Sequence, residues 1–209
     1  MELIHKYFPD LSEHQYHQYE LLWDAYKEWN DKINVISRKD IDNLYLHHIL
    51  HSMTIAKFIQ FKNGSKILDL GTGGGFPAVP LAIMFPEVNF TAIDGTRKKI
   101  TVVNEVKEIA KIENLTALHA RAEEHRKKYE FVITRAVAKI ERLKEWSMNL
   151  IDVDDQRHGQ PNGIIALKGG RVKDETNDLS KKDYFETYPL TNFINEPYFE
   201  EKYILYLQR

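Results

Sequence analysis

Apolar residues recur every three to four positions in the first part of the chain. Between residues 12 and 33 the aromatic and aliphatic side chains keep this spacing, and Ser12 with Gln15 forms the capping-box pattern of a helix start. A second series with the same period follows Asp40. Residues 1–63 are therefore predicted to form a helical extension.

From residue 64 the pattern changes to short apolar runs that alternate with amphipathic stretches. The predicted strands are 66–70, 88–94, 115–119, 129–134 and 163–168, and the predicted helices are 76–85, 96–112, 120–127, 139–151 and 171–182. Such alternation indicates a parallel sheet with helices on both faces. The runs 183–190 and 202–209 have no helix between them, so we expect a closing pair with an antiparallel strand. Residues 64–209 are thus predicted to be one α/β domain with a seven-stranded, mostly parallel sheet.

Composition excludes several kinds of chemistry. The chain has no cysteine, so a thiolate nucleophile, cysteine-ligated zinc and iron–sulfur clusters are ruled out. Of the 209 residues 43% are apolar, which is enough for a folded core, yet no apolar run is long enough to span a membrane. Because the first ten residues lack the pattern of a secretory signal, we expect a cytoplasmic protein.

Charge is unevenly distributed along the chain. The formal net charge is −2, but basic residues outnumber acidic ones between Arg97 and Glu145. This asymmetry is compatible with one basic face for nucleic acid, or with ordinary solvated surface.

The stretch KILDLGTGGGFPAVP places a glycine-rich loop directly after the first predicted strand. Glycines at this point allow a tight turn and expose backbone N–H groups to a ligand. A dinucleotide fingerprint would need a small third residue where Phe76 stands. The spacing instead follows acid-x-Gly-x-Gly-x-Gly from Asp69 through Gly71 and Gly73 to Gly75. This pattern is typical of class I S-adenosylmethionine (SAM) methyltransferases; the alternative is a structural turn.

Two later positions fit the same ligand. Asp94 ends the second predicted strand, where doubly wound folds place the acid that binds ribose hydroxyls, although it could instead cap the next helix. The stretch His119-Ala-Arg-Ala-Glu-Glu124 follows the third strand, where such folds wrap a loop around the adenine; either glutamate could equally be plain surface.

The residues after the fourth predicted strand discriminate between acceptors. The Asn/Asp-Pro-Pro-aromatic motif of exocyclic-amine methylation is absent, and Arg135 stands where ribose methylation commonly pairs a lysine with an aspartate. A ring nitrogen such as guanine N7 already has a free lone pair and needs no general base. Arg135 could donate to guanine O6 or to phosphate, or it could be structural.

Several longer matches together resemble one family. They are Trp29-Asn-Asp-Lys-Ile-Asn34, His48-Ile-Leu-His-Ser52, Leu68-Asp-Leu-Gly-Thr-Gly-Gly-Gly-Phe-Pro77, Pro80-Leu-Ala82, Arg121-Ala-Glu-Glu124, Thr134-Arg-Ala-Val-Ala138 and Ala166-Leu-Lys-Gly169. These segments are similar to the RsmG (GidB) methyltransferases, which methylate N7 of a guanosine in the decoding region of bacterial small-subunit (16S) ribosomal RNA.

The resemblance implies specific roles. SAM contacts map onto Gly71, Gly73, Phe76, Asp94, Ala122, Glu123 and Arg135. A basic rim facing the RNA maps onto Arg97, Lys98, Lys139 and Lys168. The implied partner is small-subunit ribosomal RNA or the assembling 30S particle, and we expect a monomer without a metal.

The chain departs from the family pattern at the second predicted helix. The family more usually shows Arg-His-x-x-Asp-Ser, whereas this chain has His47-His-Ile-Leu-His-Ser52. His47 and His51 share a helix face like a metal pair, but no third ligand is in view. The polar loop 152–163 also looks longer than the family's brief turn.

Three other functions remain open from the sequence. The protein could methylate a small molecule, with the N-terminal helices as a lid over a closed pocket. A nicotinamide-dependent oxidoreductase and a non-catalytic RNA-binding factor are further alternatives.

Overall fold

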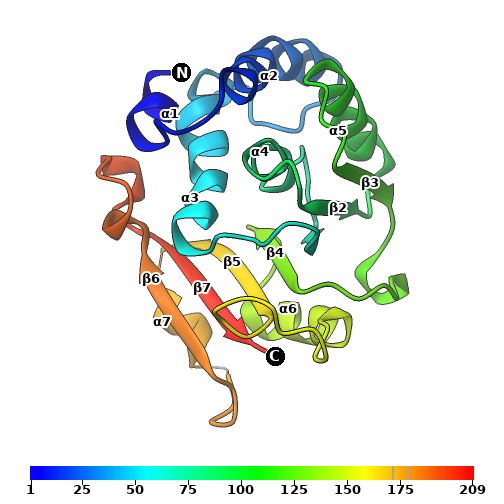
Figure 1. The fold of residues 1–209 in the computed structure, drawn as a ribbon, viewed down its shortest axis with the longest axis vertical. Coiled ribbons are helices and arrows are strands. Elements are labelled where there is room, and N and C mark those ends of the chain that lie inside the picture. Colours follow the sequence, from blue (N-terminus) through cyan, green and yellow to red (C-terminus); the bar gives the residue numbers. More distant parts are fainter. Residues whose placement is uncertain (171, 178) are drawn as a thin grey trace.

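The computed structural model describes residues 1–170, 172–177 and 179–209. Its described strands form one sheet in the order β3-β2-β1-β4-β5-β7-β6 (Figure 1). The strands are β1 (Lys66–Leu70), β2 (Asn89–Asp94), β3 (Leu115–His119), β4 (Phe131–Arg135), β5 (Gly163–Gly169), β6 (Phe185–Pro189) and β7 (Lys202–Gln208). Strands β1 to β5 pair in parallel, and β7 runs antiparallel to both β5 and β6. The predicted mostly parallel sheet with an antiparallel C-terminal strand is confirmed.

The helices agree with the prediction in part. They are α1 (Glu2–Tyr7), α2 (Glu13–Lys32), α3 (His51–Phe58), α4 (Ala78–Met84), α5 (Arg97–Ile109), α6 (Ile140–Ser147) and α7 (Val172–Thr176). The capping box at the start of α2 is present, with the Ser12 and Gln15 side chains bonded to each other's backbone N–H. The segment before α3 is a 3-10 turn followed by a π-helical stretch, Leu44–Leu50, and not a regular α-helix.

Two predicted helices are wrong in extent. The stretch predicted as helix 120–127 contains only a 3-10 turn, Ala122–Glu124, because its charged residues give a helix no apolar face to bury. The predicted helix 171–182 is described only as α7, and residues 171 and 178 lie outside the described residues. None of the described helices is long and apolar enough to cross a membrane.

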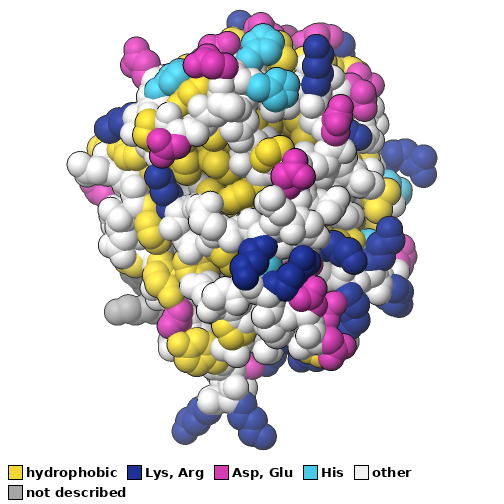
Figure 2. Space-filling model, in the orientation of Figure 1, with side chains coloured by type: hydrophobic (Ala, Val, Ile, Leu, Met, Phe, Trp, Pro, Cys, Tyr) yellow, Lys and Arg dark blue, Asp and Glu magenta, His cyan; other side chains and the backbone are white. Residues whose placement is uncertain are grey.

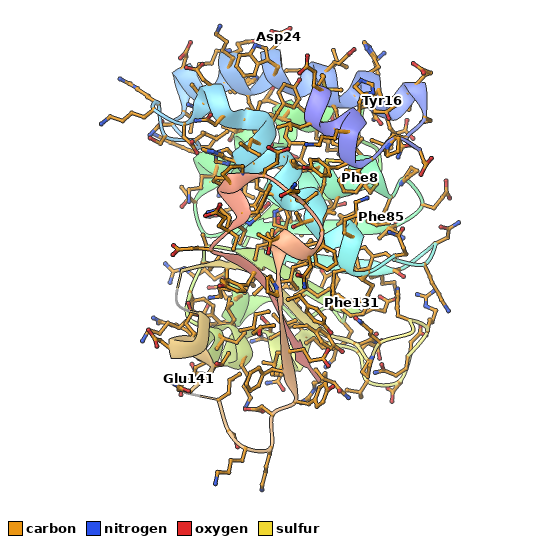
Figure 3. The ribbon with its side chains drawn as sticks, turned by 90° about the vertical axis from the view of Figure 1, so that its left-hand side faces the viewer. Phe8, Tyr16, Asp24, Phe85, Phe131 and Glu141 are labelled. Atoms are coloured by element: carbon orange, nitrogen blue, oxygen red, sulfur yellow. The ribbon has the colours of Figure 1, made fainter. Side chains whose placement is uncertain are left out.

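Alternate residues of the strands point to opposite faces of the sheet and pack into two hydrophobic layers. On one face, side chains such as Phe90 and Phe131 pack with the helices α2, α3, α4 and α5. On the other face, Val132 and Ile164 pack with α6. The first cluster crosses residue 63, so burial joins the N-terminal helices to the sheet. Figure 3 shows this stack, with Phe131 inside and the exposed Asp24 and Glu141 at its two ends.

The N-terminal helices also support the glycine-rich loop between β1 and α4. Tyr26 on α2 is fully buried, its hydroxyl donates to the Gly74 carbonyl at 2.7 Å, and its ring stacks on Phe76. Gly75 has a φ of +98°, and a Cβ there would lie 2.6 Å from the Val79 side chain. This position therefore requires glycine.

Tyr26→Phe should lower the free energy of unfolding by about 1–2 kcal/mol, because the buried Gly74 carbonyl loses its hydrogen-bond donor. Urea denaturation measures the change. The matched control is Tyr184→Phe, since Tyr184 is 57% exposed and its bond to Glu186 lies at the surface. That control should change stability by less than about 0.5 kcal/mol. Equal effects of the two substitutions would contradict the assigned role of Tyr26.

Candidate functional site

A large cleft lies at the carboxyl ends of β1, β2, β4 and β5, as open parallel sheets favour. Its volume is about 860 Å³, and a second cavity of about 330 Å³ adjoins it. Gly71, Asp94 and Val137 line both. The two cavities can therefore hold one extended ligand.

Asp69 lies beneath the glycine-rich loop. Its side chain is fully buried, and one carboxylate oxygen accepts hydrogen bonds from the Thr72 hydroxyl at 2.6 Å and the Ala78 N–H at 3.0 Å. The other oxygen has no hydrogen-bond partner among the described residues. Burial raises the pKa of Asp69 to about 7, although both hydrogen bonds oppose this shift. Asp69 therefore holds the loop from below and lines neither cavity.

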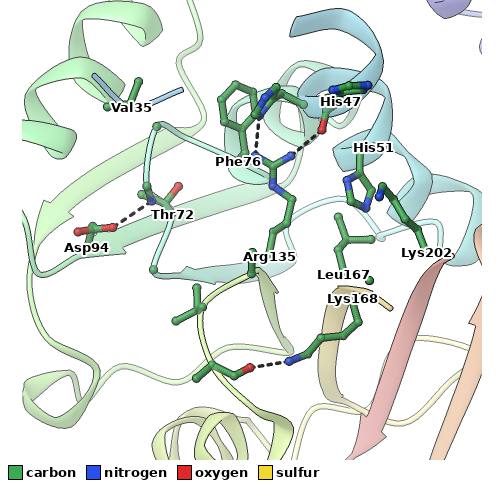
Figure 4. Close-up of a pocket in the computed structure, with 18 of the residues that line it drawn as sticks. Val35, His47, His51, Thr72, Phe76, Asp94, Arg135, Leu167, Lys168 and Lys202 are labelled. Carbon is green, nitrogen blue, oxygen red and sulfur yellow. Dashed lines mark hydrogen bonds between the residues drawn. The ribbon is translucent and has the colours of Figure 1, made fainter. Parts of the chain in front are cut away.

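Asp94 lies at the junction of the two cavities. Its carboxylate accepts from the Gly73 N–H at 3.0 Å (Figure 4). It also accepts from the Thr96 N–H at 2.8 Å. The bond to Thr96 closes a turn before α5 and is not the expected helix cap, because Thr96 itself is the N-cap residue and its side chain makes no capping bond. A carboxylate has about four lone-pair positions, so Asp94 retains acceptor capacity for a ligand.

The smaller cavity contains the residues predicted near an adenine. Ala122 and Glu123 line it from the 3-10 turn after β3, and Trp146 on α6 also lines it. A Cβ on Gly71, whose φ is +69°, would lie 2.6 Å from the Val137 side chain. Trp146 was not predicted, because its place follows from packing and not from a motif. Val137 belongs to the matched segment Thr134–Ala138, but no role was assigned to it.

Arg135 is held by the N-terminal helical segment. Its guanidinium donates to the His47 carbonyl and to His48 Nδ1, each at 2.9 Å, and lies 5.0 Å from the centre of the Phe76 ring. His48 Nε2 is 2.8 Å from an oxygen of Asp40. Arginine can only donate and a carboxylate can only accept, so His48 is neutral with its proton on Nε2.

The pKa shifts of His48 and Asp40 agree with a neutral His48 between Arg135 and an ionised Asp40. Burial, followed by the charge of Arg135, lowers the pKa of His48 to about 4. Burial alone would raise the pKa of Asp40, but hydrogen bonds from His47 and His48 bring it below its usual value. Asp40 and His48 were not predicted as site residues. The sequence did contain a signal for this contact, because Asp40 stands just before the segment that carries His47 and His48.

A further wall of the cleft comes from the end of the chain. Tyr198 stacks on His47 with ring centres 3.9 Å apart, and the Lys202 ammonium lies 4.0 Å from the centre of the Tyr198 ring. No motif marked these residues. His47 and His51 both line the cleft, but within the described parts of the chain no group of three or more possible metal ligands occurs.

The predicted basic rim is only partly exposed. Arg97 and Lys98 at the start of α5 and Lys139 before α6 are exposed and do not line the cleft. Lys168 differs from the expectation: it lines the cleft but is only 8% exposed, and its ammonium bonds the Ala138 carbonyl at 2.5 Å and Glu175 at 2.7 Å. Burial at the end of β5 demands these partners, so Lys168 is not a free surface cation.

The uneven charge expected from the sequence is visible on the surface. Figure 2 shows one face on which most Lys and Arg side chains lie in the lower right half.

The polar loop 152–163 is held in place by hydrogen bonds and an ion pair. The Asn162 side-chain amide donates to the backbone carbonyls of Asp152 and Asp155, and Arg157 pairs with Glu130.

Solved structures show the same architecture. The chain is similar to MtNAS in complex with MTA and tNA, with a TM-score of 0.63 and 10% identity over 91% of this chain and 70% of that one. It is also similar to precorrin-6y C5,15-methyltransferase from Geobacter metallireducens, with a TM-score of 0.55 and 10% identity over 85% and 92% of the two chains. These similarities show the fold alone.

Sequence relatives identify the family. The ribosomal RNA small subunit methyltransferase G of Bacteroides thetaiotaomicron is 48% identical over 208 residues, which cover 100% of both chains. The protein of the same name from Christiangramia forsetii is 47% identical and covers 99% of this chain and 96% of its own. The family model described as "GidB: rRNA small subunit methyltransferase G" matches residues 15–195. The chain therefore belongs to the GidB family of small-subunit ribosomal RNA methyltransferases.

Proposed function

We propose that this protein transfers a methyl group from SAM to N7 of a guanosine in 16S ribosomal RNA. One observation carries the proposal: two cavities meet at Gly71 and Asp94, and the larger one continues past the fixed guanidinium of Arg135. The smaller cavity suits an adenosyl group and the larger one suits an acceptor base. Family membership supports the ribosomal RNA substrate.

The residues present fit SAM. Asp94 has acceptor capacity for ribose hydroxyls, and Ala122 with Glu123 would border the adenine. A Cβ on Gly73 would meet no described atom within 4 Å, so the loop backbone at this glycine is open to a ligand. Asp69 would stabilise the positive charge of SAM from beneath the loop. When bound, SAM supplies an electrophilic methyl group on a sulfonium.

The acceptor nitrogen needs orientation more than activation. The N7 lone pair forms the new N–C bond as the C–S bond breaks and its electron pair stays on sulfur, so no proton is removed. Arg135, held by the His47 carbonyl and His48, would orient the guanine through O6 or an adjacent phosphate. Phe76 stacks against the same guanidinium.

The RNA would be bound mainly through its phosphates. Arg97, Lys98 and Lys139 are exposed and available for this role. Lys168 would bind a phosphate only after its ion pair with Glu175 had broken. A monomer acting in the cytoplasm is consistent with this mode of binding.

The direct test is methyl incorporation into RNA. Purified protein and SAM with a labelled methyl group are added to 16S RNA and to 30S particles from cells that lack this activity. The expected result is one methyl group at a guanosine N7, mapped by borohydride and aniline cleavage. Absence of incorporation into both substrates would contradict the proposal, and methylation of a metabolite alone would favour a small-molecule methyltransferase.

Asp94→Ala should weaken SAM binding by about 1–3 kcal/mol, because ribose hydroxyls lose their acceptor and the Gly73 N–H loses its partner. Isothermal titration calorimetry measures the change. Asp24→Ala, which removes an exposed carboxylate on α2, is the control and should leave the affinity unchanged. An unaltered SAM affinity in Asp94→Ala would remove Asp94 from the site.

SAM affinity should rise with pH between 6 and 8. The pKa of Asp69 is about 7, so below this pH its proton must leave before the carboxylate can stabilise the cationic ligand. If only the deprotonated form of Asp69 allows tight binding, SAM should bind about tenfold more tightly at pH 8 than at pH 6. Titrations at several pH values measure it, and Asp69→Asn should abolish the dependence. The same slope in the variant would assign it to another group.

A further inference from the structure

His51 is the first residue of α3 and lines the large cleft. It is only 7% exposed, and neither ring nitrogen makes a hydrogen bond of normal geometry to a described residue. Figure 4 shows His51 beside Lys202, on the opposite side of Arg135 from Asp94 and Thr72. The imidazole therefore belongs to the half of the cleft away from the glycine-rich loop.

Packing alone does not explain a histidine at this position. The ring lies edge-on to Tyr198 and Phe199, with centres 5.8 Å and 5.7 Å away. These aromatic neighbours would accept an apolar side chain of similar size. The nearby His47 carbonyl can at most accept from one ring N–H, so the second nitrogen stays without a partner among the described residues. A buried polar atom without a partner reduces stability, so its retention points to a partner that arrives with a ligand.

The charges around His51 define what that partner can be. Arg135 and Lys202 bear positive charge nearby. Burial, followed by these charges, lowers the pKa of His51 well below its usual value, although the backbone carbonyl of His47 acts in the opposite direction. Lys168, on the same side of the cleft, is already paired with Glu175. The neutral ring thus offers one donor and one acceptor nitrogen beside groups that can only donate.

Guanine matches this arrangement better than adenine does. The guanine O6 is an acceptor next to the N1–H and N2–H donors, whereas adenine has a donor at N6 and an acceptor at N1. Donors such as Arg135 and Lys202 therefore suit O6, and a neutral imidazole can accept from the adjacent guanine N–H groups. An adenine in the same position would place its N6 amino group, a donor, against the cations Arg135 and Lys202.

We propose that His51 is a specificity-determining residue that hydrogen-bonds the N–H edge of the acceptor guanine in this half of the cleft. The inference rests on the proposed function and extends it to the residue that recognises the base. His51 takes no part in bond making, so its substitution should affect base recognition and leave SAM binding intact.

The test compares His51→Phe with His51→Gln in the full-length protein. His51→Phe should lower kcat/KM for RNA by about ten- to a hundredfold, since a guanine N–H loses its acceptor. Its Tm should be unchanged or higher, because a buried unpaired polar group has gone. SAM affinity should stay within about twofold, and His51→Gln should recover part of kcat/KM because an amide can still accept.

A synthetic RNA that carries adenosine in place of the target guanosine adds a direct readout of specificity. The preference of the wild-type protein for guanosine should shrink in His51→Phe. The matched control is His158→Phe, because His158 lies at the other end of β1 and accepts from the Lys62 N–H at 3.2 Å. This control should lower the Tm and leave kcat/KM unchanged.

The outcomes separate the two proposals. If the wild-type protein methylates no RNA, the proposed function fails. If it does and His51→Phe keeps full kcat/KM and full preference for guanosine, His51 does not read the base. If His51→Phe fails to fold, His51→Leu takes its place; a destabilised and inactive His51→Gln would then assign His51 a structural role and overturn the inference.

Discussion

The arrangement of the site depends on one buried carboxylate, Asp69. Asp69 lies in β1, and its side chain accepts from the Thr72 hydroxyl and the Ala78 N–H, which would otherwise be unpaired in the core. With these groups satisfied, the loop can leave β1, expose its glycine backbone and enter α4. The cost of burying Asp69 appears in its raised pKa, and that cost gives the loop a negative charge beneath the place where a cationic methyl donor would lie.

The N-terminal helices build half of the cleft. Tyr26 supports the loop at Gly74, and the π-helical stretch presents the His47 carbonyl and His48 to Arg135. A π-helical stretch inside a helix is uncommon and often occurs at functional positions. Arg135 comes from β4 in the sheet, so its orientation depends on contacts across residue 63. Residues 1–63 therefore take part in the site and are more than a cover over it.

The sequence predicted the parts of the fold that repeat a local pattern. Alternating runs identified the strands, and three-to-four spacing identified α2, α5 and α6. The glycine-rich loop and Asp94, which were predicted to bind the cofactor, lie where the two cavities meet. The helix expected at 120–127 is a clear difference. Lys168, which was expected on a basic rim facing the RNA, lines the cleft but is buried. In both cases tertiary burial decides: the first segment has no apolar stripe to bury, and the second side chain is enclosed and paired with Glu175.

By itself the sequence determined the fold class, the glycine-rich loop and the family, because these depend on residue types at short, fixed spacings. Only the tertiary structure decided which distant residues line the half of the cleft away from the glycine-rich loop. His51 near the start of the chain and Tyr198 and Lys202 near its end are far apart in sequence, and the packing of α3 and the chain end on the sheet brings them together at the cleft. Asp40 contacts His48, which also lines the cleft. Long-range packing of this kind leaves no local pattern, since each contact depends on elements whose spacing in the sequence is unrelated to their distance in space.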